Sequence, residues 1–165
     1  MNDKFPEVHD TTIEDQYKIT TNVNGNECNV EILDTAGQDD YQSMLDSWIA
    51  FADGFILVFS VDDSESLEVV KDRIEKIFVL KYKDSKNKPP IVVVGNKCDL
   101  ENRKISYTEV YDYCKKLGLD YLECSALNKT NVKEAFIKIF EKLILINKPE
   151  KEELNSKQTK KCFCF

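Results

Sequence analysis

Two short apolar runs constrain the fold of this chain more than any other feature of its sequence. Residues 54–60 read Gly-Phe-Ile-Leu-Val-Phe-Ser, and residues 91–95 read Ile-Val-Val-Val-Gly. Apolar runs of this length, without polar alternation, are typical of strands that are buried on both faces of a parallel sheet. Apolar residues recur at helical spacing after Ser64, which we expect to cap a helix, and again over residues 106–117 and 131–143. Strands that alternate with helices predict an α/β fold with a doubly wound sheet.

An antiparallel hairpin is predicted before these strands. Apolar and polar residues alternate over residues 17–23 and again over residues 28–32, and Asn24-Gly25 separates the two runs. Asn-Gly between two alternating runs is a strong signal for a tight hairpin turn. Residues 40–52 carry apolar side chains at helical spacing and predict a helix, and residues 121–124 predict a short strand.

Length and composition indicate one domain followed by a tail. The chain has 165 residues, enough to bury a sizeable core, and after Pro149 its composition shifts to Lys, Glu, Asn and Gln. We therefore predict a domain over residues 1–147 and a flexible tail over residues 148–165. The net charge of −7 argues against a nucleic-acid binder. The sequence shows no secretory signal and no apolar run that could span a bilayer, so we expect its six cysteines to be reduced.

Three polar clusters each follow a predicted strand. They are Asp34-Thr35-Ala36-Gly37-Gln38, Asn96-Lys97-Cys98-Asp99 and Ser125-Ala126. Ligands of doubly wound sheets bind beyond the carboxyl ends of the strands, so we expect the three clusters to line one crevice. Asp34 could support a divalent cation through water, and Gly37 leaves its backbone N–H open to a phosphate oxygen. Gln38 offers both a donor and an acceptor with which to orient a water molecule. Any one cluster could be an ordinary polar turn, but the three together predict a ligand site.

Together with the hairpin and the Thr-Ile-Glu-Asp segment at residues 12–15, these motifs resemble Ras-type small GTPases from Phe5 to about Asn147. The resemblance implies a guanine-nucleotide switch that cycles between GTP and GDP by hydrolysis, with Mg²⁺ as cofactor. It assigns the main base contact to Asp99, whose carboxylate could accept both the ring N–H and the exocyclic amine of guanine. Asn96 would face the base and brace the neighbouring loop, and the Ala126 N–H would meet the guanine carbonyl oxygen. The other base contacts that it implies are Phe5, Lys97 and Ser125.

On the phosphate side, the resemblance assigns four residues to Mg²⁺, the γ-phosphate and water. Thr12 would ligate Mg²⁺ with its hydroxyl and contact the γ-phosphate with its N–H. Asp34 would support Mg²⁺ through water, Gly37 would donate to the γ-phosphate, and Gln38 would position the attacking water as the catalytic residue. The implied protein partners are effectors, exchange factors and GTPase-activating proteins. The residues implied for this partner surface are Ile13, Glu14, Asp15 and Tyr41.

The main departure from the family pattern is the absence of a phosphate-binding loop. The sequence contains no G-x-x-x-x-G-K-S/T motif, whose lysine and hydroxyl residue contact the phosphates and Mg²⁺. The family's first strand, which is central in its sheet, and its first helix are missing with this loop. We therefore expect poor GTP binding and little hydrolysis, and the sequence leaves open whether the remaining strands form one continuous sheet. Leu127 also stands where a base-stacking lysine is common.

The sequence ends in Lys160-Lys161-Cys162-Phe163-Cys164-Phe165, which places Cys162 at the C-a-a-X position. A terminal Phe favours geranylgeranylation, although Phe163 and Cys164 are not the usual aliphatic residues. The neighbouring lysines would add the second, basic contact that a single lipid usually needs. We therefore expect a prenyl anchor on Cys162 and a location at the cytoplasmic face of a membrane, with the plasma membrane favoured. The alternative is an unmodified tail.

Two functional interpretations remain open from the sequence. In the first, the protein is a membrane-tethered GTP-binding switch represented by an N-terminally incomplete chain, because Met1-Asn2-Asp3-Lys4 resembles the end of the family's first helix. In the second, it is a natural short form that binds partners without catalysis, a pseudo-GTPase that cannot hold nucleotide tightly. A NAD-type enzyme is disfavoured, because no G-x-G-x-x-G motif follows a predicted strand.

Overall fold

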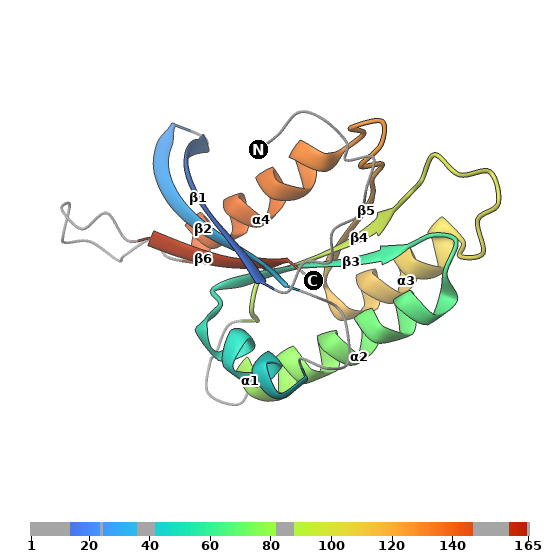
Figure 1. The fold of residues 1–165 in the computed structure, drawn as a ribbon, viewed down its shortest axis with the longest axis horizontal. Helices are drawn as coiled ribbons and strands as arrows, with labels where there is room; N and C mark the ends of the chain where they lie inside the picture. The colour runs from blue at the N-terminus through green and yellow to red at the C-terminus, as the bar shows by residue number, and fades with distance from the viewer. Residues whose placement is uncertain (1–13, 24, 36–41, 82–87, 147–158, 165) are drawn as a thin grey trace.

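The computed structural model describes residues 14–23, 25–35, 42–81, 88–146 and 159–164. Over these residues the chain alternates between strands and helices, as the apolar runs predict (Figure 1). The strands are β1 (Glu14–Val23), β2 (Asn26–Thr35), β3 (Gly54–Ser60), β4 (Ile91–Asn96), β5 (Asp120–Glu123) and β6 (Thr159–Cys164). The helices are α1 (Gln42–Phe51), α2 (Ser64–Lys81), α3 (Tyr107–Leu117) and α4 (Val132–Ile146).

These strands belong to one sheet with the order β1-β2-β6-β3-β4-β5 (Figure 1). β1 and β2 pair antiparallel, and all the other neighbouring strands pair parallel. The hairpin turns at Gly25, whose φ of 84° suits glycine and whose N–H donates to the Asn22 side chain at 3.0 Å. The predicted α/β fold class, with its N-terminal antiparallel hairpin, is therefore confirmed.

Helices cover both faces of this sheet, with α4 on one face and α1, α2 and α3 on the other (Figure 1). β3 shows why its sequence is apolar throughout: Phe55, Leu57 and Phe59 pack on the side of α1, α2 and α3, whereas Ile56 packs on the side of α4. Each strand side chain therefore finds an apolar layer, whichever face it points to. None of the helices in the described part of the chain is long and apolar enough to cross a bilayer.

A serine side chain caps the start of α3, and the predicted cap of α2 is displaced by one residue. The Ser106 side chain accepts the Glu109 N–H at 3.3 Å at the start of α3. At the start of α2, the Asp63 carboxylate accepts the Glu65 N–H at 3.0 Å, and Ser64 lies inside the first turn. Asp and Ser are both good capping residues, so the local sequence could not decide between two adjacent ones.

The largest correction concerns the predicted flexible tail, residues 148–165. Within it, Thr159–Cys164 form β6, which lies between β2 and β3 and pairs in parallel with both. Without this strand, the facing edges of β2 and β3 would leave backbone N–H and C=O groups unpaired inside the sheet. The sequence left the continuity of the sheet open, and β6 makes the sheet continuous at this position.

Candidate functional site

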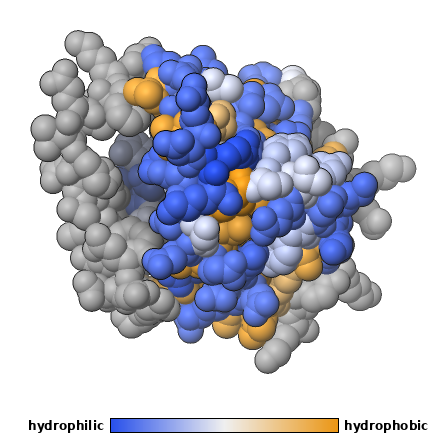
Figure 2. Space-filling model, turned by 90° about the vertical axis from the view of Figure 1, so that its right-hand side faces the viewer, coloured by the Kyte–Doolittle hydropathy of each residue, from blue (hydrophilic) through white to orange (hydrophobic). Residues whose placement is uncertain are grey.

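The loops that follow β3, β4 and β5 lie at one edge of the sheet, because these three strands run in parallel. Figure 2 looks onto the side of the molecule where the arrows of β3 and β4 end in Figure 1, and its surface is mostly hydrophilic around a small apolar area. Two predicted clusters, residues 96–99 and 125–126, stand in these loops. The structure therefore brings the predicted base-binding residues to the edge where ligands of such sheets bind.

A hydrogen bond joins the loops after β4 and β5. The Asn96 side-chain oxygen accepts the Ala126 N–H at 3.1 Å, so Asn96 braces the neighbouring loop. The hydroxyl of Ser125, a fully buried residue, accepts the Asn128 N–H at 3.0 Å, and Ser125 also pairs with Thr130 through the backbone. The Ala126 N–H, which the family resemblance assigns to the guanine carbonyl oxygen, is thus donated to Asn96 in this structure. A guanine carbonyl oxygen bound here would share this N–H with Asn96.

Lys97 pairs with Asp62, an acidic residue that is not among the predicted site residues. Its backbone is left-handed, with a φ of 62°, and its ammonium group lies 3.4 Å from the Asp62 carboxylate. Asp62 also accepts the Ser60 hydroxyl, and this hydrogen bond, together with the charge of Lys97, lowers the pKa of the Asp62 carboxyl. Asp62 lies two residues beyond the end of β3, so a search for polar residues after each predicted strand, applied to β3, would have found it.

The turn that carries Asp99 is fixed by backbone hydrogen bonds. The Cys98 N–H donates to the Cys124 carbonyl at 3.0 Å, and the Leu100 N–H donates to the Lys97 carbonyl at 3.0 Å. Asp99 itself is exposed on this turn. An exposed carboxylate on a fixed turn can accept two parallel N–H groups, which is the pattern that the edge of guanine presents. The chemistry of this donor and acceptor set therefore fits a guanine base.

Asp34, at the end of β2, belongs to the predicted phosphate side. In the strand register it stands between Asp15 of β1 and Cys164 of β6, and the neighbouring Thr35 hydroxyl donates to the Cys164 carbonyl at 3.3 Å. Burial, and then the charge of Asp15, raise the pKa of the Asp34 carboxyl. Within the described ranges, no group of three or more His, Cys, Asp or Glu side chains could hold a metal. The metal-supporting role of Asp34 therefore stays a prediction.

Replacing Asp34 with asparagine is expected to raise the melting temperature at pH 7 and to leave it nearly unchanged at pH 3. The folded-state pKa of Asp34 lies above its unfolded value of about 4, so the folded protein loses stability as the pH rises through this range. Below it, the carboxyl is protonated in both states and costs nothing. Thermal unfolding across pH 3 to 8 measures the effect, with Asp46→Asn at an exposed position as control. A lower melting temperature for Asp34→Asn than for the unsubstituted protein at pH 7 would contradict the predicted stabilisation.

The remaining predicted site residues lie outside the described residues or are described only in part. Glu14 and Asp15 begin β1, which is an edge strand, and Asp15 is exposed there. The structure thus leaves their roles, and those of the residues outside, as predictions. The predicted residues that lie outside the described part are Phe5, Thr12, Ile13, Gly37, Gln38 and Tyr41.

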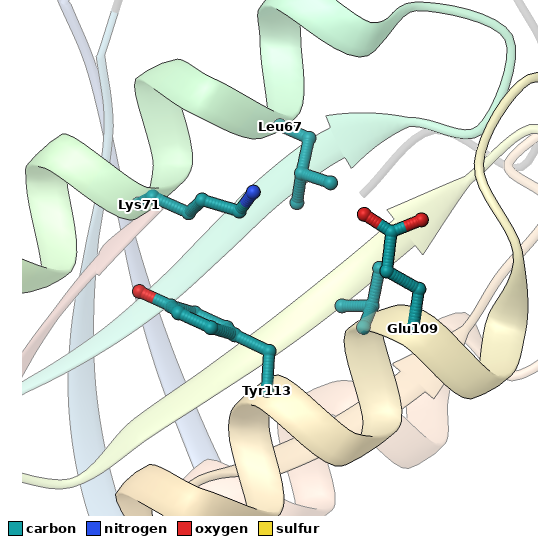
Figure 3. Close-up of a pocket in the computed structure, with 5 residues that line it drawn as sticks. Leu67, Lys71, Glu109 and Tyr113 are labelled. Carbon is teal, nitrogen blue, oxygen red and sulfur yellow. The ribbon is translucent and has the colours of Figure 1, made fainter.

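A shallow pocket of about 140 Å³ between α2 and α3 is separate from this site (Figure 3). The Lys71 ammonium group lies 5.6 Å from the centre of the Tyr113 ring and 2.7 Å from the Glu68 carboxylate. The ammonium group of Lys71 is therefore engaged with neighbours on both helices. The residues that line it are Leu67, Lys71, Glu109, Val110 and Tyr113, and none of them is a predicted site residue. Packing between the helices explains this pocket.

Comparisons with known proteins lead to the same class of site. The family model described as the Ras family matches residues 1–145. The Ras-like protein rasB of Dictyostelium discoideum is 42% identical over 158 residues, which cover 95% of this chain and 77% of that protein. The matched region runs from the N-terminus through the hairpin and both base-side loops into α4, and thus includes the residues on which the resemblance was based.

Proposed function

This chain belongs to the Ras family, and we propose that it is a signalling switch that recognises guanine nucleotides with the loops after β4 and β5. Family membership supports a small-GTPase role in signalling, with GTP, GDP and Mg²⁺ as ligands and with regulators and effectors as protein partners. The observation that carries the proposal is the 3.1 Å hydrogen bond between Asn96 and Ala126. This bond joins the two loops on which Asp99 and the Ser125-Ala126 pair stand.

Guanine recognition is proposed to depend on three side chains of the loop after β4. The Asp99 carboxylate would accept the ring N–H and the exocyclic amine, a pair of donors that adenine does not offer. The aliphatic part of Lys97 would cover the ring plane, and its ammonium group pairs with Asp62. Asn96 would contact the base while it positions the loop of Ala126. Phe5 would contribute an aromatic edge.

The phosphate side is proposed to use Thr12, Asp34, Gly37 and Gln38 in the roles that the family resemblance assigns to them. Mg²⁺, when bound, would neutralise phosphate charge. Asp34 suits a place beside a cation, because burial and Asp15 both disfavour its ionised form and a positive charge would offset them. Gln38 would hold the attacking water. GTP hydrolysis through these residues is part of the proposal.

The absence of a G-x-x-x-x-G-K-S/T motif limits how tightly the phosphates can be held. We therefore propose weak nucleotide binding and little hydrolysis for a chain of this sequence. The same absence favours a second candidate function, a non-catalytic module that binds effectors through a surface of Ile13, Glu14, Asp15 and Tyr41. Asp15 is exposed on an edge strand, as a partner surface requires.

Nucleoside binding without phosphates separates these candidates. We expect guanosine to bind at least about tenfold more tightly than adenosine, because the base-side contacts are intact, and GDP to gain no more than about tenfold over guanosine. Titrations followed by amide chemical shifts of Asn96 and Ala126 measure all three ligands. If neither guanosine nor GDP bound, only the second candidate function, the non-catalytic effector-binding module, would remain. If GDP bound about a thousandfold more tightly than guanosine, other parts of the chain would have to hold the phosphates.

Membrane attachment through prenylated Cys162 remains a second part of the proposal, with a location at the cytoplasmic face of a membrane. Cys162 has an exposed fraction of 0% in the described fold, where it packs in the cluster beneath α4. A lipid could not be attached to a thiol in this position. Attachment would therefore require Thr159–Cys164 to leave the sheet.

A further inference from the structure

We propose that the space between β2 and β3 is an exchangeable strand-binding site, which residues 159–164 enter and leave as a unit while the rest of the sheet stays folded. We call this space the β2–β3 slot; it is bounded by residues 29–34 of β2 and 54–56 of β3. Its occupant in the structure is β6, a segment of the same chain. The inference concerns the sheet and does not depend on guanine recognition.

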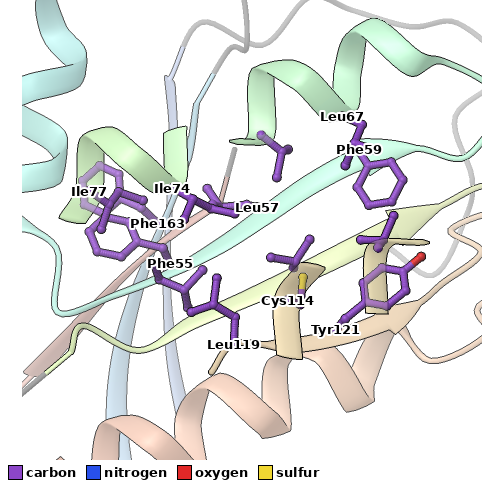
Figure 4. Close-up of a cluster of buried hydrophobic side chains, with 14 of the residues drawn as sticks. Phe55, Leu57, Phe59, Leu67, Ile74, Ile77, Cys114, Leu119, Tyr121 and Phe163 are labelled. Atoms are coloured by element: carbon purple, nitrogen blue, oxygen red, sulfur yellow. The ribbon is translucent and has the colours of Figure 1, made fainter. Parts of the chain in front are cut away.

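Two side chains anchor β6 in the slot, one on each face of the sheet. Phe163, 4% exposed, packs with Phe55 and Ile77 on the side of α1 and α2 (Figure 4). Cys162 packs on the opposite face, in the cluster of α4. Successive residues of a strand point to opposite faces, so this pair fills both apolar layers at the centre of the sheet. The segment is therefore specifically seated.

Polar contacts hold β6 at Lys161, its third residue, and at Cys164, its last residue. The Asp53 N–H donates to the Lys161 carbonyl at 2.8 Å, and the Asp53 carboxylate accepts the Lys161 N–H at 3.0 Å. The Thr35 hydroxyl donates to the Cys164 carbonyl at 3.3 Å. We call the two hydrogen bonds between Asp53 and Lys161 the clasp. Both residues are exposed, so the clasp can open to water without disturbing the core.

β6 buries fewer apolar side chains than β3 and β4. Its strand pairing does not set it apart, because β6 pairs over six positions with β2 and three with β3, and β3 pairs over six with β4 and three with β6. Among its side chains, only Cys162 and Phe163 are fully buried, whereas β3 and β4 each contribute four buried apolar side chains. Local stability follows buried apolar contacts and protected hydrogen bonds, so β6 should open before β3 and β4 do.

Release of β6 would change the chemistry of Cys162. In the slot, its thiol is fully buried; outside it, the thiol is open to alkylating or lipid-transferring reagents. A group attached to the sulfur would have no room beneath α4, so a modified strand could not return. Occupancy of the slot and modification of Cys162 therefore exclude each other, and the slot controls when this residue can react.

Hydrogen exchange on the full chain tests whether the strand opens separately. We expect amides of residues 159–164 to exchange at least about tenfold faster than those of residues 91–96 in β4, yet well below the rate of an unstructured peptide. The facing amides of residues 29–34 and 54–56 should exchange in the same event. If the amides of β6 exchanged only as fast as those of β4, β6 would not open separately from the rest of the sheet. Exchange at the unstructured rate would show that the slot is not occupied. Either result overturns the proposal.

A variant of the clasp provides a second test that leaves both apolar anchors in place. Asp53→Ala removes one hydrogen bond to Lys161, and we expect iodoacetamide to label Cys162 about fivefold faster under native conditions. Cys114 and Cys124, which are buried elsewhere, serve as internal references and should not change. Asp46→Ala is the matched control, because this exposed carboxylate on α1 pairs with Lys76 and not with β6. Equal labelling of Cys162 in both variants would overturn the proposal, whatever the protein does with guanosine.

Discussion

Replacing Asp99 with alanine is expected to lower the preference of the protein for guanosine over adenosine about 10- to 100-fold. A charged contact to two parallel donors contributes about 1 to 3 kcal/mol of discrimination between bases. Only guanine presents that pair of donors, so the substitution should weaken the binding of guanosine and leave the binding of adenosine nearly unchanged. Asp99 is exposed on a turn that backbone hydrogen bonds hold, so its removal should not disturb the fold.

The control for Asp99→Ala is Glu101→Ala, which removes another exposed carboxylate from the same loop. Both variants lose one negative charge, so a general electrostatic effect on ligand binding would appear equally in the two. The affinities of guanosine and adenosine are measured by the same chemical-shift titration. A loss of discrimination in Glu101→Ala, with Asp99→Ala unchanged, would show that the base lies elsewhere along this edge.

Much of the fold could be predicted because local patterns decide it. The strand over residues 54–60 is buried on both faces over most of its length, and its run of apolar residues up to Phe59 predicts this. The hairpin turn at Gly25 and the Ser106 cap of α3 depend on residues a few positions apart, which a sequence shows directly. The cap of α2 shows the limit of such patterns, because Asp63 and Ser64 are adjacent and chemically equivalent as caps.

Thr159–Cys164 could not be predicted as a strand from its own residues. The segment contains two lysines and only two fully buried side chains, Cys162 and Phe163, which is too short a pattern to show a period of two. Its conformation is determined by the facing edges of β2 and β3, which are distant in sequence. The residues of this segment alone could not show that it would pair between β2 and β3.

The base side of the candidate site was predictable, and its internal contacts were not. Residues 96–99 and 125–126 were placed correctly at the strand ends, since parallel strands bring their carboxyl ends to one edge. The ion pair of Lys97 with Asp62 joins loops that follow two different strands, so it emerges only from the three-dimensional arrangement. The same is true of the hydrogen bond from Ala126 to Asn96.

Gly95 of β4 is the position where packing and the site are most closely coupled, and Gly95→Ala should lower the free energy of unfolding by about 2 kcal/mol. A Cβ atom there would lie 2.8 Å from the Tyr121 hydroxyl and 3.0 Å from the edge of the Phe59 ring. Both rings are buried and stacked with centroids 6.1 Å apart, so neither can rotate away freely. A fall of roughly 4 to 8 °C in the melting temperature is expected.

The matched control is Gly54→Ala, the same substitution at the start of β3. Its Cβ would meet the ends of the Leu143 and Ile139 side chains at 3.1 and 3.2 Å, and these flexible chains can move aside. We therefore expect a loss below about 1 kcal/mol, measured by the same denaturant titration. Equal losses in the two variants would show that the rigid rings are not the cause.

A double variant tests the cause directly. Tyr121→Phe removes the hydroxyl that the new Cβ meets, at the cost of the hydrogen bond from Tyr121 to the Glu123 carboxylate at 2.9 Å. That single change should cost about 1 kcal/mol. In the combined Gly95→Ala, Tyr121→Phe variant, the free energy of unfolding should fall by about 1 kcal/mol less than the sum of the two single losses. The reason is that the clash with the hydroxyl is gone, although the contact with Phe59 remains. Strict additivity would contradict this explanation. Since Gly95 directly precedes Asn96, the same double variant should also recover part of any guanosine affinity that Gly95→Ala loses.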